Sequence, residues 1–253
     1  MKYVRKIIAL LIGLVFFAAI VISLGMIFAV RNINVTMITY ADAESEIYSE
    51  SFNNAKTSLE VFKGESILFV GEKSVAGIVK DSNYTLDSFE KKYPCTINIS
   101  LRERLETFSV SVGGMYSMYD SDGRHLRNSA ENNNVNDGTP NVELLAVPID
   151  KIESVAHIAG MFKSSFGGLR SLVAAISIDS SPEIEGYTER LYFNLRCGLK
   201  IQIVDYSADT AEKINEAYKK FVTLTDRQKL SGTIRSYRIG GESGLINADY
   251  SKI

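Results

Sequence analysis

The spacing of apolar residues changes several times along the chain, and each spacing predicts a different element. Branched and aromatic residues dominate 33–40, which favours a strand. Spacings of four and three residues then predict one face of an amphipathic helix, formed by Tyr48, Phe52, Ala55, Leu59 and Phe62. A short strand or extended segment is expected at 66–70, and a second short helix at 72–80.

Residues 93–104, YPCTINISLRER, alternate between apolar and polar and predict a strand. The alternation places Glu103 on the apolar face, where it could be a general acid, half of an ion pair, or the point where the strand leaves the core. Two further strands are expected at 107–118 and from 124 onward. The turn before the second of these is Asp120-Ser-Asp-Gly123, which resembles the start of a calcium loop but lacks the downstream glutamate.

Residues 127–141 contain six asparagines and almost nothing apolar, so they are predicted to form a linker and a domain boundary. Beyond it a strand is expected at 142–149, and a helix whose start resembles a capping box at Asp150 and Glu153. Residues 169–178 fit either a helix or a strand. A hairpin at 190–206, a helix capped by Asp209 and a terminal strand at 232–239 complete the pattern, followed by a glycine-rich turn and a short tail.

The order of these elements predicts an α+β fold in two domains. The first is a domain with helices on one face of a small sheet, and the second is richer in antiparallel sheet. The expected organisation is a tail at 1–6, a transmembrane helix at 7–30, a first domain at 31–126, a linker at 127–141 and a second domain at 142–253.

The transmembrane prediction rests on 24 residues without a charge, Ile7–Val30. As a helix they would be about 36 Å long, and a hydrocarbon core is about 30 Å thick. Lys2, Arg5 and Lys6 precede the run, so the positive-inside rule leaves the short tail in the cytoplasm and the bulk of the chain outside. A cleaved signal peptide is the alternative, but its apolar core would be shorter and would end in small residues.

Composition narrows the range of partners. All 30 acidic residues follow the apolar run and three of the 28 basic residues precede it, so the rest of the chain is mildly acidic. Such a balance gives no electrostatic footprint for nucleic acid and favours a protein partner. Cys95 and Cys197 are too few for a disulfide framework or a metal cluster, and whether they form one long-range bridge stays open.

Candidate catalytic residues are few. His157 lies opposite the apolar stripe of its helix and His125 follows a hairpin turn, so both are expected to be solvated. Ser88 to Lys91 matches the S-x-x-K pattern without an accompanying K-T-G, and residues 241–244 lack the spacing of a nucleophile elbow. No catalytic, cofactor-binding or metal-binding residue is therefore predicted, and a membrane-anchored wall enzyme is disfavoured.

Two motifs nevertheless carry a resemblance to a known family. Pro94, Glu103 and Arg104 fit a P-x-x-x-I-x-[VL]-x-E-R strand, while Asp120 and Gly123 fit a G-x-Y…D-x-x-G hairpin. With the basic tail and the apolar helix, the chain resembles the FtsQ/DivIB family of bacterial cell-division proteins. That resemblance implies a POTRA domain followed by a β domain. Because burying an unpaired carboxylate is costly, Glu103 is expected to form a salt bridge or a hydrogen-bonded kink that closes the first sheet.

The resemblance also implies a function. Members of the family are non-catalytic scaffolds that bind small membrane proteins of the FtsB/DivIC and FtsL type outside the membrane and help control septal peptidoglycan synthesis. A septal, single-pass membrane protein without a cofactor or small-molecule substrate is therefore expected. If the terminal strand lies at a sheet edge, it would pair with a partner through Ile234, Ser236, Tyr237 and Ile239. The alternative is a membrane-anchored POTRA-type chaperone or secretion-assembly subunit.

Overall fold

The structure, a computed structural model, describes residues 2–38, 46–134, 138–179, 189–240 and 244–252. It divides the chain into two compact units, Met1–Arg104 and Leu105–Ile253, here called unit 1 and unit 2. Each unit has its own hydrophobic core. Both units mix helices and strands, so the predicted α+β class is confirmed at this level.

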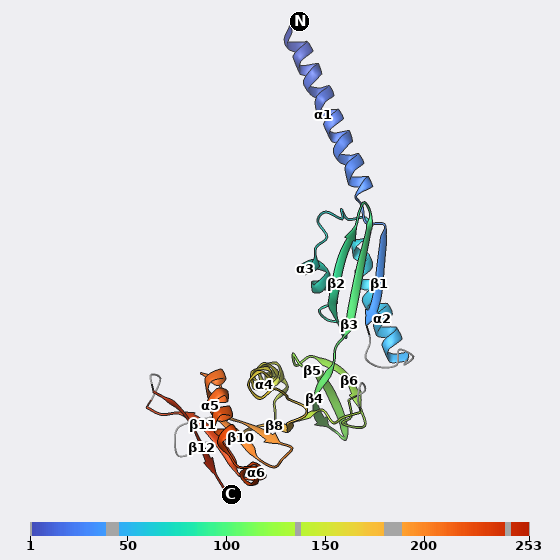
Figure 1. Ribbon diagram of the computed structural model, residues 1–253. Helices are drawn as coiled ribbons and strands as arrows, with labels where there is room; N and C mark the ends of the chain where they lie inside the picture. Colours follow the sequence, from blue (N-terminus) through green and yellow to red (C-terminus); the bar gives the residue numbers. More distant parts are fainter. Residues whose placement is uncertain (1, 39–45, 135–137, 180–188, 241–243, 253) are drawn as a thin grey trace. The chain divides into compact units, whose positions relative to one another are not determined.

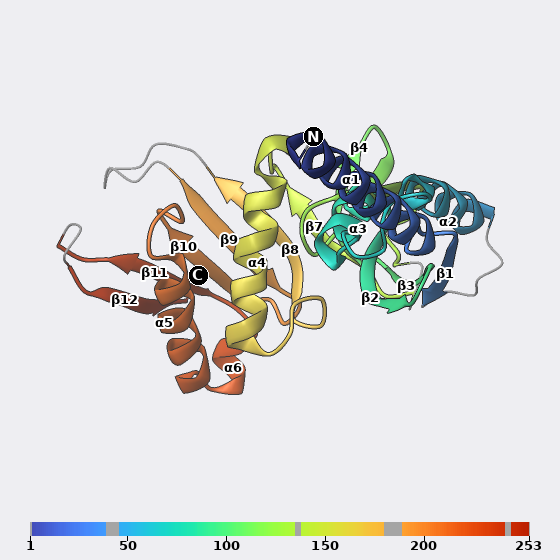
Figure 2. The same cartoon turned by 90° about the horizontal axis from the view of Figure 1, so that it is seen from above.

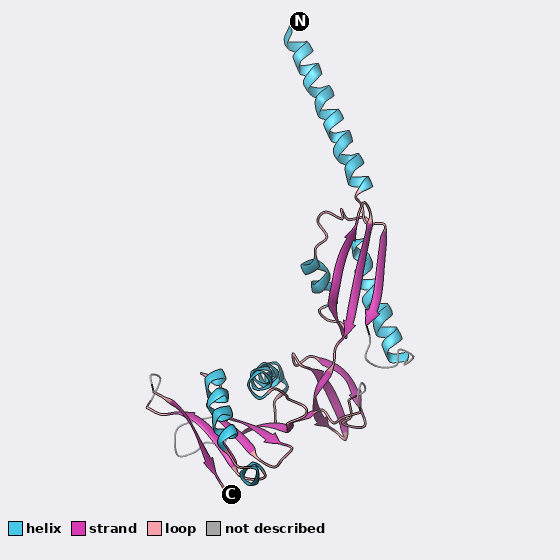
Figure 3. Ribbon diagram, viewed as in Figure 1, coloured by secondary structure: helices cyan, strands magenta, loops and turns pink. Residues whose placement is uncertain are grey.

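Unit 1 is a three-stranded sheet with two helices on one face (Figure 1, Figure 3). Its elements are α1 (Lys2–Ile27), β1 (Asn32–Ile38), α2 (Glu46–Leu59), a 3₁₀ helix (Glu60–Phe62), α3 (Glu72–Val79), β2 (Tyr84–Lys92) and β3 (Thr96–Glu103). The strand order is β1-β3-β2, with β1 parallel and β2 antiparallel to β3. Within the described part of the chain, no helix has the length and hydropathy of a membrane span.

The predicted alternation of β3 is confirmed. Ile97, Ile99, Leu101 and Glu103 are buried, and the residues between them are partly exposed. The buried side chains pack against α2 and α3 through residues such as Leu59 and Val75, as a half-buried sheet requires. The extended segment expected at 66–70 is instead mainly a turn, with a single bridge between Ala29 and Ser66.

Strand β2 is not predicted from the sequence, because a bulge interrupts the alternation of apolar and polar side chains along it. The register shifts between Leu86 and Ser88, so Leu86 and Phe89 both pack against the core although they are three residues apart. Ser88 and Lys91 lie on this strand, where an odd spacing points two side chains to opposite faces. The S-x-x-K match therefore does not bring its serine and lysine together.

Unit 2 is built on one nine-stranded sheet. Its elements are β4 (Glu106–Val112), β5 (Met115–Asp120), β6 (His125–Ser129), β7 (Val142–Leu145), a 3₁₀ helix (Ile149–Lys151), α4 (Ile152–Phe166), β8 (Val173–Asp179), β9 (Arg190–Leu195), β10 (Lys200–Val204), α5 (Thr210–Thr223), α6 (Asp226–Lys229), β11 (Thr233–Arg238) and β12 (Ile246–Ser251). The strand order is β12-β11-β10-β9-β8-β7-β4-β5-β6. Helices α4 and α5 lie across the same face of the sheet, over a core that includes Phe162, Phe193 and Ile214 (Figure 2).

The domain boundary differs from the predicted one. Strands β4, β5 and β6 belong to the large sheet, since β4 pairs with β7 beyond the asparagine-rich segment. The predicted first domain at 31–126 and linker at 127–141 are therefore replaced by a division between Arg104 and Leu105. Sequence composition missed this because a pairing between β4 and β7 is non-local and leaves no mark on either segment.

Several local predictions for unit 2 are settled. The helix behind Ile152 and the hairpin of β9 and β10 are confirmed, and the ambiguous 169–178 contains strand β8. The capping box at Asp150 and Glu153 is wrong, because α4 begins after Lys151 without a side-chain cap. Asp209 does precede α5, but its carboxylate bonds Arg238 rather than capping the helix. The expected tail contains β12.

Candidate functional site

Strand β11, predicted to be a docking edge, is an interior strand. It pairs in parallel with β10 on one side and antiparallel with β12 on the other. Ile234 and Ser236 are fully buried, Tyr237 is partly buried and Ile239 lies just beyond the strand. The backbone groups of Ile234 and Ser236 thus face neighbouring strands, so the sheet edge on which the predicted partner contact depended is not formed by β11.

Strand β12 is the end of the sheet in the described part of the chain. Ile239 N donates to Leu245 O at 2.9 Å, and the register continues this pairing through Tyr237 with Asn247. Because hydrogen-bonded and non-bonded pairs alternate along an antiparallel ladder, the backbone groups of Ile246, Ala248 and Tyr250 point away from β11. In the sequence these three apolar residues alternate with polar ones. That period of two is weak, but it could have predicted the strand.

Side chains hold β12 against the sheet. The Tyr237 hydroxyl donates to Asp249 Oδ2 at 2.6 Å, and the Arg235 guanidinium lies 5.3 Å from the centre of the Tyr237 ring. The hydrogen bond to Asp249, with a smaller contribution from burial, raises the pKa of Tyr237 above its ordinary value. On the other face, Ala248 and Tyr250 pack against the core. These side-chain contacts hold the edge in place and use none of the outward backbone groups of Ile246, Ala248 and Tyr250.

The first motif of the resemblance lies in unit 1. Pro94 is in the turn between β2 and β3, joined to Tyr93 by a cis peptide bond. Glu103 is the last residue of β3, 4% exposed, and lies opposite the fully buried Tyr84 in the register. Arg104 follows it and donates its backbone N–H to Asn83 O at 2.9 Å. This motif closes the sheet of unit 1.

The second motif lies in unit 2, which separates it from the first. Asp120 is buried at the end of β5, and its Oδ1 accepts the N–H groups of Asp122 and Arg124, both at 2.9 Å. Gly123 has a φ of +81°, and a Cβ there would lie 2.8 Å from Glu153 Cα. Glycine is needed for both reasons, so this turn docks the strands against the start of α4.

A buried polar network around Glu106 was not predicted. Glu106 is 2% exposed, and its carboxylate accepts from Arg127 Nε. Its backbone carbonyl accepts from Asn134 Nδ2 at 2.7 Å and from Arg170 Nη1 at 3.2 Å. Asn134 also donates to the side chain of Asn141 at 3.1 Å. The asparagine-rich segment thus covers the start of unit 2 as part of its structure.

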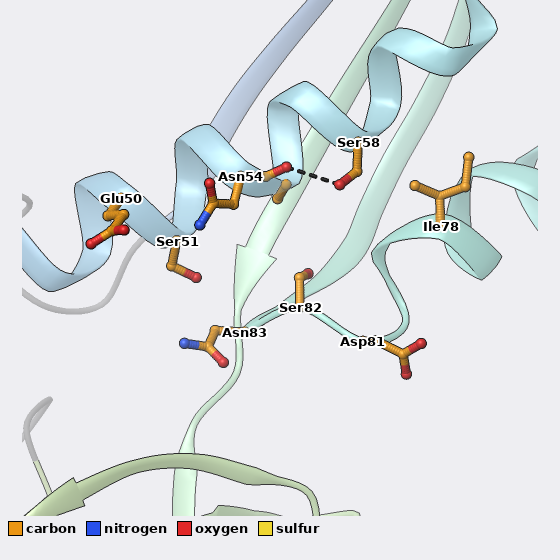
Figure 4. A pocket seen from close by; sticks show the side chains of 9 residues that line it. Glu50, Ser51, Asn54, Ser58, Ile78, Asp81, Ser82 and Asn83 are labelled. Carbon is orange, nitrogen blue, oxygen red and sulfur yellow. Dashed lines mark hydrogen bonds between the residues drawn. The ribbon is translucent and has the colours of Figure 1, made fainter.

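Each unit has a cavity large enough for a small ligand. In unit 1, a cavity of about 480 Å³ between α2 and α3 is lined by hydroxyl, amide and carboxylate groups (Figure 4). Ser58 Oγ there donates to Asn54 O at 3.0 Å. In unit 2, a cavity of about 330 Å³ lies beside Phe108 and Leu169, with Lys163 and Arg170 among its lining residues. Neither places a histidine or cysteine beside a serine, and both histidines are exposed.

The metal-binding residue types and the two cysteines do not form a candidate site in the described part of the chain. Among the described residues, no group of three or more His, Cys, Asp or Glu side chains is placed to hold a metal ion. Cys95 and Cys197 are both free thiols, and they belong to different units. The features that remain are the edge of β12 and the motifs that shape the two units.

Several solved structures match the chain, among them a domain of a bacterial cell-division protein. No family model and no curated protein matches the chain. The major extracytoplasmic domain of the trans isomer of the bacterial cell division protein DivIB from Geobacillus stearothermophilus matches at 14% identity and a TM-score of 0.31. The match covers 49% of this chain and 98% of that chain. At this level the likeness carries no argument about fold or function.

Proposed function

We propose that this chain is a non-catalytic, membrane-anchored docking protein of the bacterial cell-division machinery, of the FtsQ/DivIB type. The strand motif at Pro94, Glu103 and Arg104 and the hairpin motif at Asp120 and Gly123 support the family assignment. The observation that carries the docking role is the outer edge of β12, which ends the described sheet with the backbone groups of Ile246, Ala248 and Tyr250 turned outward.

The proposed anchor is the uncharged run Ile7–Val30 taken as a whole, including positions whose side chains lie outside the described part of the chain. Where side chains of α1 are described, apolar ones such as Leu14, Phe16 and Phe17 are more than 60% exposed. A helix that presents apolar side chains all round is suited to a membrane or a buried core. By the positive-inside rule, the basic residues before it favour an orientation in which the bulk of the chain lies outside the cytoplasm.

The proposed partner is a short segment of an FtsB/DivIC- or FtsL-type membrane protein, added as a further strand beside β12. Main-chain hydrogen bonds to Ile246, Ala248 and Tyr250 would supply affinity, and side chains beside the edge would supply specificity. Leu245 and Ile239, 82% and 50% exposed at the hairpin end of β11 and β12, offer apolar contact to such a segment.

A proline substitution tests the edge. Ala248→Pro removes an N–H that points away from β11, so the β11–β12 ladder keeps its hydrogen bonds while a partner strand loses one. Binding to the extracytoplasmic part of the partner should weaken about 5- to 10-fold, the equivalent of one hydrogen bond of 1–1.4 kcal/mol. Ala248→Ser keeps the N–H and should bind as the parent does. Unchanged binding by a folded Ala248→Pro protein would rule out strand addition at β12.

The cellular role has a separate test. A fluorescent fusion of the full chain should gather at mid-cell, and depletion of the protein should produce filamentous cells. A uniform membrane signal with normal division would contradict the cell-division proposal and favour a POTRA-type chaperone or secretion-assembly subunit.

A further inference from the structure

Three exposed apolar side chains gather at one end of unit 1. Phe69 is 83% exposed, Tyr93 59% and Leu68 54%, although Leu68 and Phe69 lie between the buried Ile67 and Val70. Leu68 and Phe69 lie in the turn before α3, and Tyr93 lies in the turn between β2 and β3. We call these three residues, with the exposed Arg31 and Lys92, the rim of unit 1.

Contacts tie the rim to the end of α1. Phe28 directly follows α1, and its carbonyl accepts the N–H of Ile67 at 2.7 Å. The Phe28 ring packs edge-on against the Tyr93 ring, with centroids 6.3 Å apart. Lys91 Nζ donates to Leu68 O at 3.2 Å and so joins the two turns of the rim. The rim therefore lies where α1 leaves the unit (Figure 1).

The connection between α1 and the sheet is held by hydrogen bonds. Val30 N donates to Glu65 O and Arg31 N donates to Cys95 O, both at 2.8 Å, and Gly64 N donates back to Val30 O at 2.9 Å. The Arg31 side chain also reaches Met26 O at 3.3 Å, a carbonyl in the last turn of α1, where a positive charge is favourable. These hydrogen bonds fix the residues that connect α1 to the rim.

The chemistry of the rim fits a bilayer interface. Aromatic rings with a polar tip, such as Tyr93, are enriched at the headgroup level of membranes, and basic side chains there attract anionic lipid. Arg31, Lys91 and Lys92 lie at this end of the unit, with Glu65 as an exposed opposing charge. Insertion of the apolar side chains is therefore the main expected contribution, and the basic residues add to it.

We infer that the rim, led by Phe69 and Tyr93, inserts into the headgroup region of the bilayer that holds α1 and seats unit 1 on the membrane surface. This inference rests on the proposed membrane anchor. The end of unit 1 that carries the rim then contacts lipid, and the opposite end of its sheet, where β1 ends at Ile38, is in water.

The chain contains no tryptophan, so single tryptophans report position in the full-length protein. Phe69→Trp probes the rim and Phe17→Trp probes α1. Ile38→Trp is the control, because Ile38 is 36% exposed and ends the strand that begins beside α1. At about 3.3 Å per residue, β1 carries Ile38 about 20 Å from its first residue. Each protein is reconstituted in three kinds of phosphatidylcholine vesicle: without bromine, with lipid brominated near the headgroup to probe the rim, and with lipid brominated deep in the acyl chains to probe α1.

The inference predicts a blue shift of Phe69→Trp emission in unbrominated vesicles and loss of that emission with lipid brominated near the headgroup, while Ile38→Trp keeps its emission. Quenching of Phe17→Trp without quenching of Phe69→Trp would overturn the rim and leave the anchor standing. An unquenched Phe17→Trp in α1 would overturn the anchor itself. Equal quenching of Phe69→Trp and Ile38→Trp would also contradict a contact confined to the rim.

Discussion

At the scale of single residues, Glu103 owes its importance to a buried neighbour. Tyr84 lies opposite it in the register of β2 and β3 and is fully buried. Burial, and then the charge of Glu103, raise the pKa of Tyr84 from 10.0 to about 12. The Tyr84 phenol therefore stays protonated at neutral pH where it faces Glu103 at the end of the sheet. The salt bridge expected at Glu103 stays a prediction.

Replacing Glu103 with glutamine should therefore lower the pKa of Tyr84. The value should fall below about 12 but stay above 10.0, because burial still disfavours the phenolate. NMR titration with labelled tyrosine measures it, and Glu90→Gln on the exposed face of β2 is the matched control. An unchanged pKa in Glu103→Gln would remove Glu103 as a cause.

The same shift gives a pH dependence of stability. The folded pKa of Tyr84 lies above its ordinary value, so its contribution to stability is complete below about pH 10 and is lost as the pH rises through about 12.

At the scale of elements, the asparagine-rich segment shows how composition misleads. Its residues lack apolar surface, yet Asn134 and Asn141 are each 1% exposed and bond to one another and to the segment around Glu106. Polar side chains can be buried when they have hydrogen-bond partners, and here Glu106 at the start of β4 is such a partner. The segment is therefore a cover for β4 and β5 as well as a connection.

Neighbouring asparagines test this cover. Asn134→Ala removes buried hydrogen bonds and should lower the free energy of unfolding of unit 2 by about 1–3 kcal/mol. Asn133 is exposed, so Asn133→Ala should change it by less than about 0.5 kcal/mol. Denaturant unfolding of the full chain compares the two. Equal effects would mean that the segment behaves as a linker after all.

At the scale of the whole molecule, the described residues form two hydrophobic cores that share no residue. One contains Leu59, Ile99 and Leu101, and the other contains Phe162 and Phe193. Because hydrophobic stabilisation comes mainly from burial within each core, a substitution should act chiefly on its own unit.

Calorimetry of the full chain should accordingly separate two unfolding transitions. Leu101→Ala and Phe193→Ala each truncate a fully buried side chain and should each cost about 2–5 kcal/mol. Leu101→Ala should lower the transition of unit 1, and Phe193→Ala that of unit 2. If either variant lowers both transitions equally, the two units unfold as one.

The sequence by itself determined most individual elements and the α+β class. The alternation through Ile97, Ile99 and Leu101 and the helical spacing through Ala55 and Leu59 are local patterns, and local backbone geometry reads them directly. The tight turn at Asp120 and Gly123 belongs to the same group. Strand β2 was not predicted, because one bulged residue reverses the alternation of apolar and polar side chains on which a strand prediction depends.

Only the tertiary structure decided what depends on distant pairing. The pairing of β4 with β7 moved the domain boundary to Arg104, and the packing of Asn134 and Asn141 turned an expected linker into a buried cover. The addition of β12 made β11 an interior strand and shifted the candidate docking edge to Ile246–Ser251. A strand carries no sequence mark of which neighbour it will take, because backbone hydrogen bonds are the same for every residue except proline.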